Sequence, residues 1–383
     1  MQTLSDLDPA LPVVSVARPV SDGGRRLLDL VFKSGGLSQA ELTRSLDLSQ
    51  PTVTRLLQGF HQDGLVRLSA RQADRPGHPS VHVSLNPDFA YALGVSMLGD
   101  ALSMTLMDFA GTVRGQRRAA MPTMTRPVVL EKLRTFMREL TDEAGIDSRR
   151  VVGMGVGISG FYVGQGQLFN PPVYLDDWAL VEIEPILEEA LRLPVRVDND
   201  GTVAAIGENL FGVGRRCRNF AYLHLTNGFG GGIIADGKPF RGQHGNAGEF
   251  GGVWTLAGVT YTNLDLLQTC LREHGHAFAT VEDMVQAIDI SWPGVSQWLD
   301  HAKHSFGVLC GLLAYSIDPG MIVIGGRLPP SIAQALVEQI VVPQQNHRRD
   351  RPPPSPKVVV AEAPGDPVAL GAAVTPLRNA FFV

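Results

Sequence analysis

Hydrophobic residues recur with a helical period in three short segments before residue 65. The first, GRRLLDLVFKS, carries its apolar residues near one face and stops at Gly35 and Gly36, which favours the end of a helix. The second begins at Ser38 with Glu41 three residues later, the spacing of a reciprocal helix cap. The third, QPTVTRLLQGF, repeats apolar residues at i, i+3, i+4 and i+7. We therefore predict three short helices, the last ending at Gly64.

The face of the third predicted helix that lies opposite its apolar stripe is polar. Ser49 is expected to cap this helix, and the polar face offers hydroxyls, a guanidinium and amides, which suit base edges and phosphates. Two strand-like segments, LVRLSA and SVHVSL, follow and are joined by RQADRPGHP, the layout of a β-wing. The predicted DNA contacts are Ser49, Gln50, Thr52, Thr54, Arg55 and Gln58 in the helix and Arg71, Arg75 and His78 in the wing. The alternative, a protein-interaction module of the same layout, stays open.

The pattern divides the chain into three parts. Residues 1–20 contain three prolines and no helical period, so we predict a loose arm. Residues 21–86 form the predicted winged helix-turn-helix domain, closed by a turn at Asn86 and Pro87. Residues 87–383 alternate apolar strands ending in glycine, such as YALGVSML, with helical stretches such as VVLEKLRTFMREL, which is typical of layered α/β domains. A basic, proline-rich stretch at 343–357 is expected to be an exposed connection, in preference to a second DNA contact.

Composition narrows the class of protein. The 383 residues are 44% hydrophobic and 19% charged, as in a folded chain of two or three domains. The net charge of -5 means that DNA binding would need a local basic patch. Three widely separated cysteines signal neither a disulfide framework nor a zinc site, which fits a reducing cytoplasm. The N-terminus lacks the pattern of a signal peptide and no segment is expected to cross a membrane, so we predict a cytoplasmic protein.

Several glycine-rich segments of the larger part are informative together: LGVSMLGDALSMTLMDFAG (93–111), VGMGVGISG (152–160), LPVRVDNDGTVAA (193–205), LTNGFGGGIIADGKPFRGQHGNAGEFGG (225–252) and DPGMIVIGGRL (318–328), followed by ALGAAV near the end. In this order and spacing they resemble the ROK family of repressors, open reading frames and sugar kinases. The resemblance covers essentially residues 20–383, including the winged helix of the family's repressors. It implies an α/β fold of two actin-like, ribonuclease H-like lobes with a ligand cleft between them.

The same resemblance exposes a departure from the family's kinases. Those kinases hold ATP phosphates with a D-x-G-G-T turn after the first strand, whereas residues 96–100 here are SMLGD. Bulky Met97 and Leu98 leave no close backbone approach for a phosphate. The second phosphate loop keeps its glycines, but Asn227 stands at the hydroxyl position. We therefore predict no catalytic residues, no kinase activity and no cofactor.

The resemblance also implies ligand contacts. Asn199 and Asp200 match the asparagine and catalytic aspartate of the family, and without a phosphate cradle they can still hydrogen-bond hydroxyls. The alternative is that this pair only caps the helix that follows. Glu249 matches a sugar-binding glutamate in GEFGG, Asp265 falls near a second one, and Asn170 in LFNPP matches a sugar-binding asparagine. The predicted ligand contacts are Asn170, Asn199, Asp200, Glu249 and Asp265.

The zinc site of the family is not expected here. Gly252 stands where the family has a zinc-binding histidine, and the C-x-C-G-x-x-G-C pattern is replaced by VWTLAGVTYTNLD. Without thiolates and that imidazole a zinc ion has no ligand set. His244 lies nearby in the sequence and is expected to be a loop histidine.

These inferences predict a transcriptional regulator, usually a repressor of carbohydrate-utilisation genes. It would bind operator DNA as a homodimer or homotetramer and respond to a sugar or sugar derivative in the cleft. Two alternatives stay open: an ATP-dependent hexose kinase with an appended DNA-binding module, and a DNA-binding protein whose former ligand cleft serves only oligomerisation.

Overall fold

The computed structural model describes residues 20–71, 80–164, 168–343, 351 and 353–383. The predicted wing contacts Arg75 and His78 lie outside the described residues, as does the side chain of Arg71. Most of the basic stretch at 343–357 lies outside them too.

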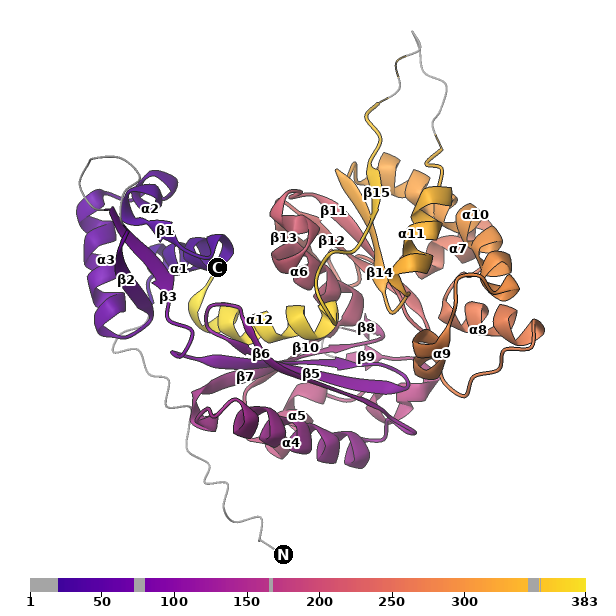
Figure 1. The fold of residues 1–383 in the computed structure, drawn as a ribbon, viewed down its shortest axis with the longest axis horizontal. Helices are drawn as coiled ribbons and strands as arrows, with labels where there is room; N and C mark the ends of the chain where they lie inside the picture. The colour runs from indigo at the N-terminus through magenta and orange to yellow at the C-terminus, as the bar shows by residue number, and fades with distance from the viewer. Residues whose placement is uncertain (1–19, 72–79, 165–167, 344–350, 352) are drawn as a thin grey trace, which may run out of the picture.

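The N-terminal part is a winged helix (Figure 1). Its first helix is capped by the Ser21 side chain and ends at Gly35, which has a left-handed φ of 71°. The predicted capping box of Ser38 and Glu41 is present at the start of the second helix. Its elements are α1 (Asp22–Ser34), β1 (Leu37–Ser38), α2 (Gln39–Ser45), α3 (Gln50–Gln62), β2 (Val66–Arg71) and β3 (Ser80–Leu85).

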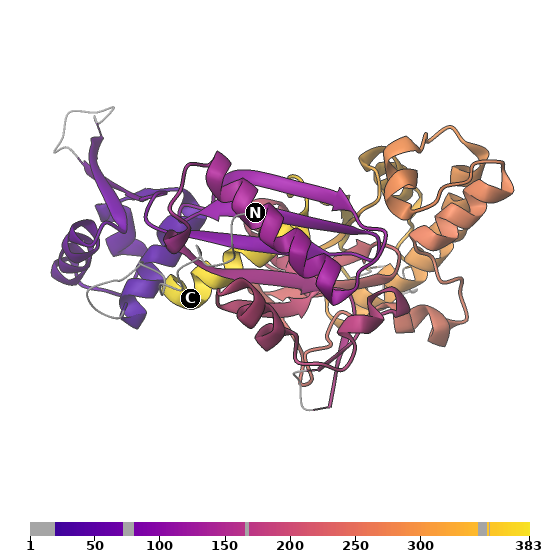
Figure 2. The ribbon, with the colours of Figure 1, turned by 90° about the horizontal axis from the view of Figure 1, so that it is seen from below.

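The first lobe is a five-stranded sheet whose own α-helices lie on one face (Figure 1 and Figure 2). Its strand order is β10-β7-β4-β5-β6, with β4, β7 and β10 parallel and β5 antiparallel to both of its neighbours. The elements are β4 (Tyr91–Met97), β5 (Ala101–Asp108), β6 (Val113–Ala120), α4 (Arg126–Glu143), η1 (Ser148–Arg150), β7 (Val151–Ile158), β8 (Phe161–Val163), β9 (Leu168–Asn170), η2 (Val173–Trp178), α5 (Ile183–Leu191) and β10 (Val195–Asn199).

The second lobe repeats this sheet topology with the order β13-β12-β11-β14-β15. Its core packs apolar side chains of the helices between residues 251 and 339 against β11 and β14. The elements are α6 (Asp200–Phe211), η3 (Val213–Arg215), β11 (Phe220–Leu225), β12 (Phe229–Ala235), β13 (Lys238–Phe240), α7 (Gly251–Ala257), α8 (Leu264–Glu273), α9 (Val281–Ala287), α10 (Pro293–Ser316), β14 (Met321–Gly326), α11 (Pro330–Gln339) and β15 (Lys357–Val360).

The last helix, α12 (Pro367–Phe381), returns to the first lobe and lies across its sheet beside α6 (Figure 1). Glycine permits this close approach, since a Cβ at Gly94 in β4 would collide with the backbone of Ala369. The far end of α12 reaches the winged helix, where the Phe382 ring lies 4.9 Å from that of Phe32 in α1. Helix α12 therefore joins the cleft region to the N-terminal domain.

Candidate functional site

The outer face of α3 is polar and largely free. Val53, Leu57 and Phe60 are buried beneath it, as the apolar period predicts. Arg55 and Gln58 are exposed on the opposite side. A helix-turn-helix unit uses such a face to enter the major groove.

The structure changes the expectation for two hydroxyls of α3. Ser49 occupies the cap position, but its side chain pairs with the Thr52 hydroxyl at 2.9 Å and caps no backbone amide. The Thr54 hydroxyl accepts a hydrogen bond from Gln39 at 2.7 Å and donates one to the Gln50 carbonyl at 3.0 Å. Thr54 therefore braces α3 against α2, and the side chains left free for DNA are chiefly those of Gln50, Arg55 and Gln58.

The predicted ligand residues Asn199 and Asp200 lie where β10 meets α6. The Asn199 side chain caps α6 by accepting from the Thr202 amide at 2.9 Å, so the capping alternative holds for its oxygen. Its amide nitrogen donates to the Gly160 carbonyl at 2.8 Å and to Glu249 Oε1 at 3.3 Å. Asn199 is thus a link between the two lobes as well as a cap.

Asp200 is a buried carboxylate at the start of α6. One oxygen accepts from the Gly201 amide at 2.8 Å and the other accepts from the Ser159 hydroxyl. His224 of β11 lies 3.8 Å from the same carboxylate, and burial lowers the pKa of this imidazole. The carboxylate is therefore held by protein donors from two sides.

Glu249 faces this group from the second lobe and is exposed on one side. Partial burial, which removes water from the carboxylate, and the negative charge of Asp200 raise its pKa to about 7. A carboxyl group with this pKa exchanges a proton near neutral pH, so it can donate or accept a hydrogen bond to a ligand hydroxyl.

Two tyrosines that sequence patterns did not single out complete the surroundings. Tyr174 bonds Ser159, and its pKa is raised by burial and by the charges of Asp200 and Asp265. The pKa of Tyr261 is raised by burial, with Glu249 and Asp265 among the nearby charges. Both rings therefore lie within electrostatic reach of the predicted ligand carboxylates, where aromatic faces suit the apolar faces of a sugar. No spacing pattern in the sequence marks either ring.

Asp265 and Asn170 lie at the edge of the group. Asp265 is in the first turn of α8 and accepts from the Asn227 amide at 3.5 Å, and burial raises its pKa. Asn170 is exposed at the end of β9, opposite Phe161 in the two-stranded sheet. The structure thus gathers Asn199, Asp200 and Glu249 directly and leaves Asp265 and Asn170 peripheral.

The turn between β4 and β5, which corresponds to the kinase phosphate turn, is filled by protein side chains. Met97 and Leu98 are buried, and a Cβ at Gly99 would lie 2.7 Å from the Tyr174 ring. Asp100 is paired with Arg327, which follows β14, through an Oδ1–Nη1 distance of 2.6 Å. No open backbone cradle faces the cleft at this turn.

A cavity of about 410 Å³ lies between the lobes beside this pair. Ser96 Oγ, both ring nitrogens of His224 and Arg327 Nε face it without a protein partner. Such buried polar atoms require water or a small molecule. Across the described residues, no three His, Cys, Asp or Glu side chains gather as a metal site would require.

Comparisons with known proteins agree with this architecture. Residues 92–257 match the sequence model of the ROK family, and residues 25–75 match that of the MarR family. The chain is 27% identical over 227 residues to the xylose repressor of Caldicellulosiruptor bescii, covering 59% of this chain and 56% of that protein. It is 24% identical over 224 residues to the DNA-binding transcriptional dual regulator NagC of Escherichia coli K12, covering 58% and 54%. These two alignments span little more than half of either repressor.

Solved structures show the same fold. A ROK family transcriptional regulator, a homologue of the E. coli MLC protein, aligns with a TM-score of 0.65 at 20% identity, covering 94% of this chain and 96% of that one. A ROK family glucokinase from Streptomyces griseus, solved with glucose and AMPPNP, aligns with a TM-score of 0.59 at 21% identity, covering 74% and 98%. The regulator and the kinase structures therefore share the two lobes, and of these two the regulator aligns with nearly the full length of this chain. The chain therefore carries a domain that matches the ROK family, preceded by a winged helix that matches the MarR family.

Proposed function

We propose that this protein is a sugar-responsive transcriptional repressor that binds operator DNA through α3 and a carbohydrate through the cleft between its ROK lobes. The observation that carries the proposal is the exposed polar face of α3, with Arg55 and Gln58 free, on a chain whose cleft gathers Asp200 and Glu249. The related proteins, a xylose repressor and the regulator NagC, support the same class.

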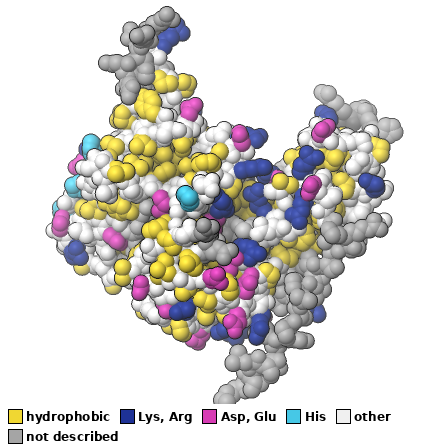
Figure 3. All heavy atoms as spheres, turned by 180° about the vertical axis from the view of Figure 1, so that it is seen from behind, with side chains coloured by type: hydrophobic (Ala, Val, Ile, Leu, Met, Phe, Trp, Pro, Cys, Tyr) yellow, Lys and Arg dark blue, Asp and Glu magenta, His cyan; other side chains and the backbone are white. Residues whose placement is uncertain are grey.

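Basic side chains next to the winged helix support the DNA-binding half. Figure 3 shows Lys and Arg gathered where the N-terminal domain meets the body of the molecule. A groove of about 890 Å³ between α1 and the second lobe is lined by Lys33, Arg215, Arg218 and Lys238, with Asp236 as its acidic member. A local positive surface offsets the net charge of -5 and attracts the DNA backbone.

The ligand half rests on hydroxyl-binding chemistry. Asp200, Asn199 and Glu249 converge from both lobes, and the side chains of Tyr174 and Tyr261 lie nearby. Carboxylates, an amide and aromatic faces are the groups that recognise a polyhydroxylated ring. We infer that the ligand changes the relative position of the lobes and thereby the DNA-binding arrangement of a homodimer or homotetramer.

We further propose that the protein is not a kinase. Asp200 has the position of a catalytic base, but the turn after β4 is packed by Leu98, Tyr174 and the Asp100–Arg327 pair. Phosphoryl transfer depends on positioning a nucleotide's phosphates, and this turn presents side chains in place of an open loop. None of the helices in the described ranges combines the length and hydrophobicity that a bilayer crossing requires.

The test is a gel-shift titration with DNA from upstream of the protein's own gene, with and without a panel of sugars and sugar phosphates. We expect a sequence-specific complex whose affinity changes with one class of carbohydrate. A panel that shifts neither the DNA complex nor the melting temperature would favour a cleft that serves only oligomerisation.

A second assay separates the regulator from a kinase. ADP release from ATP is measured across a hexose panel for the wild type and Asp200→Asn. We expect no saturable turnover in either protein. Turnover that Asp200→Asn abolishes would establish an enzyme instead.

A further inference from the structure

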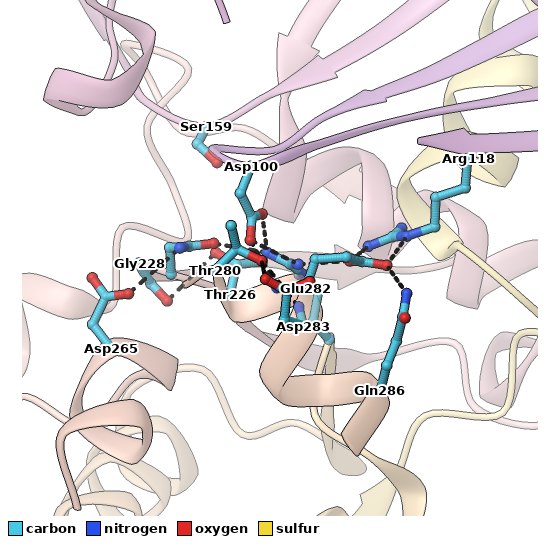
Figure 4. Close-up of polar contacts among 12 residues, drawn as sticks. Asp100, Arg118, Ser159, Thr226, Gly228, Asp265, Thr280, Glu282, Asp283 and Gln286 are labelled. Carbon is cyan, nitrogen blue, oxygen red and sulfur yellow. Dashed lines mark hydrogen bonds and ion pairs between the residues drawn. The ribbon is translucent and has the colours of Figure 1, made fainter. Parts of the chain in front are cut away.

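Three buried charged side chains and the more exposed Arg118 form a continuous cluster between the lobes (Figure 4). Arg327 pairs with Asp100 at 2.6 Å and with Glu282 of α9 at 2.7 Å. Arg118 of β6 makes a second, bidentate pair with Glu282 through Nε, at 2.9 Å, and Nη2. Only 6% of the Arg327 side chain and 8% of that of Glu282 are exposed. We call Asp100, Arg118, Glu282 and Arg327 the inter-lobe cluster.

Two of the three ion pairs in the cluster, Asp100–Arg327 and Arg118–Glu282, cross from one lobe to the other. Asp100, in the turn before β5, and Arg118 belong to the first lobe, whereas Glu282 and Arg327 belong to the second. The Glu282 amide also donates to Asp100 Oδ2 at 2.8 Å. The contacts that cross between the lobes therefore depend directly on lobe position, whereas the Arg327–Glu282 pair does not.

Contacts at the opposite edge of the cleft are of a different kind. There Asn246 exchanges two hydrogen bonds with the Tyr162 backbone, at 2.8 and 2.9 Å, and Arg241 pairs with Asp198. Arg241 and Asn246 are partly open to solvent, unlike Arg327 and Glu282. The buried ionic contact is therefore concentrated at the edge formed by β6 and α9.

The free energy of a buried ion pair suits a contact that forms and breaks as the lobes move. Pairing approximately offsets the cost of removing both charges from water, so a complete cluster adds little net stability and opening can rehydrate it. Removing one partner is different, because a buried charge that loses its partner is strongly destabilising. Without Arg327, Asp100 would lose its ionic partner while facing Glu282, which would keep only Arg118, and opening of the lobes would relieve the repulsion between the two carboxylates.

One side chain connects the cluster to the candidate ligand site. Asn227, in the turn before β12, accepts from Arg327 Nη1 at 2.8 Å and donates to Asp265 at 3.5 Å. A ligand hydroxyl bound at Asp265 would compete for the same amide group.

A second route leads to the winged helix. The Arg118 guanidinium lies 3.5 Å from Asp366, which caps the start of α12 and also accepts from Ser103. At the other end of α12, the Phe382 carbonyl accepts from Arg25 of α1 at 3.1 Å. A rigid helix thus spans the distance from the cluster to the DNA-binding domain.

We propose that the inter-lobe cluster is a latch that holds the lobes closed without a nucleotide and that α12 transmits its state to the winged helix. This inference rests on the proposed function only for its second half. The first half concerns the protein alone and can be tested without DNA or carbohydrate.

Hydrogen exchange measures the latch directly. In Arg327→Met, amides of residues 280–288 around α9 are expected to exchange about tenfold faster or more, because the Glu282 amide loses its closed partner. Amides of α10, in the core of the second lobe, should keep their wild-type rates. The matched control is Arg126→Met, which removes a pair with Asp177 inside the first lobe and should leave residues 280–288 unchanged.

If Arg327→Met fails to fold, the same exchange rates are measured in Asn227→Ala. Asn227 is uncharged and half-buried, and its loss removes one of the Arg327 contacts, so exchange at 280–288 should rise by a smaller factor. Wild-type rates at 280–288 in folded Arg327→Met, or in Asn227→Ala if Arg327→Met does not fold, would overturn the latch.

Operator affinity then tests transmission. Arg327→Met should change the affinity for upstream DNA severalfold, and adding Phe382→Ala should remove that change by uncoupling α12 from α1. Faster exchange with unaltered affinity would overturn transmission and leave the latch in place. A wild-type protein that binds no operator would overturn the proposed function while the exchange result stands independently.

Discussion

Polar side chains are free on the outer face of α3 but bonded to other protein groups in the interior of the cleft. On α3, Arg55 and Gln58 are exposed without a protein partner in the described contacts. In the cleft, Asn199, Asp200 and Arg327 are each bonded to two or more protein groups. The difference indicates that the outer face of α3 is free to recognise an external partner. The contacts in the cleft, in contrast, depend on the relative position of the two lobes.

The largest effect is expected when a buried side chain is removed from the core beneath α3. Leu57 is 2% exposed, so Leu57→Ala should lower the free energy of unfolding of the winged helix by about 2–4 kcal/mol. Urea unfolding followed by circular dichroism measures this loss. Leu56→Ala, next along the chain and only half-buried, is the matched variant and should cost less. Equal losses for the two leucines would contradict the assigned burial of α3.

Removing a free side chain from α3 should affect recognition without affecting the fold. Arg55→Ala is expected to weaken operator binding by about 1–3 kcal/mol, or about 5- to 150-fold, if Arg55 contacts a base. The melting temperature and carbohydrate binding should not change. Arg138→Ala on α4, an exposed arginine remote from α3, is the control in the same gel-shift titration. An operator affinity of Arg55→Ala equal to that of the wild type would show that Arg55 makes no base contact.

The smallest expected effect concerns a cleft carboxyl group. Because the pKa of Glu249 is raised to about 7 from 4.5, the folded state binds its proton more tightly than the unfolded state does. Its contribution to stability is therefore complete below pH 4.5 and is lost as the pH rises through 7. Allowing for the solvent exposure of Glu249, this loss amounts to about 1 kcal/mol.

Glu249→Gln should remove that pH dependence. The difference in unfolding free energy between wild type and variant is measured by urea titration at pH 5 and pH 8. Glu189→Gln, at an exposed position of α5, is the control. If the unfolding free energy of Glu249→Gln depends on pH as that of the wild type does, another group is responsible for the dependence.

Sequence patterns located α3 and its buried stripe because both depend on residues within one helix. The capping box of Ser38 and Glu41 was predictable for the same reason. The Asp100–Arg327 pair was not, since 227 positions separate its members and only the packing of two lobes brings them together. Asn199 illustrates an intermediate case: its place at a helix start was predicted, but its bond to Glu249 required the fold. Tyr174 lies in a segment without a recognisable period, so no local pattern could mark it.

The most direct measurement of the central claim is fluorescence anisotropy of a labelled operator, with and without the carbohydrate, for wild type and Asp200→Asn. The account predicts that the carbohydrate changes the operator affinity of the wild type and that Asp200→Asn binds the operator normally but no longer responds. A wild-type protein that binds the carbohydrate by calorimetry and yet holds the operator with the same affinity in its presence would contradict the account.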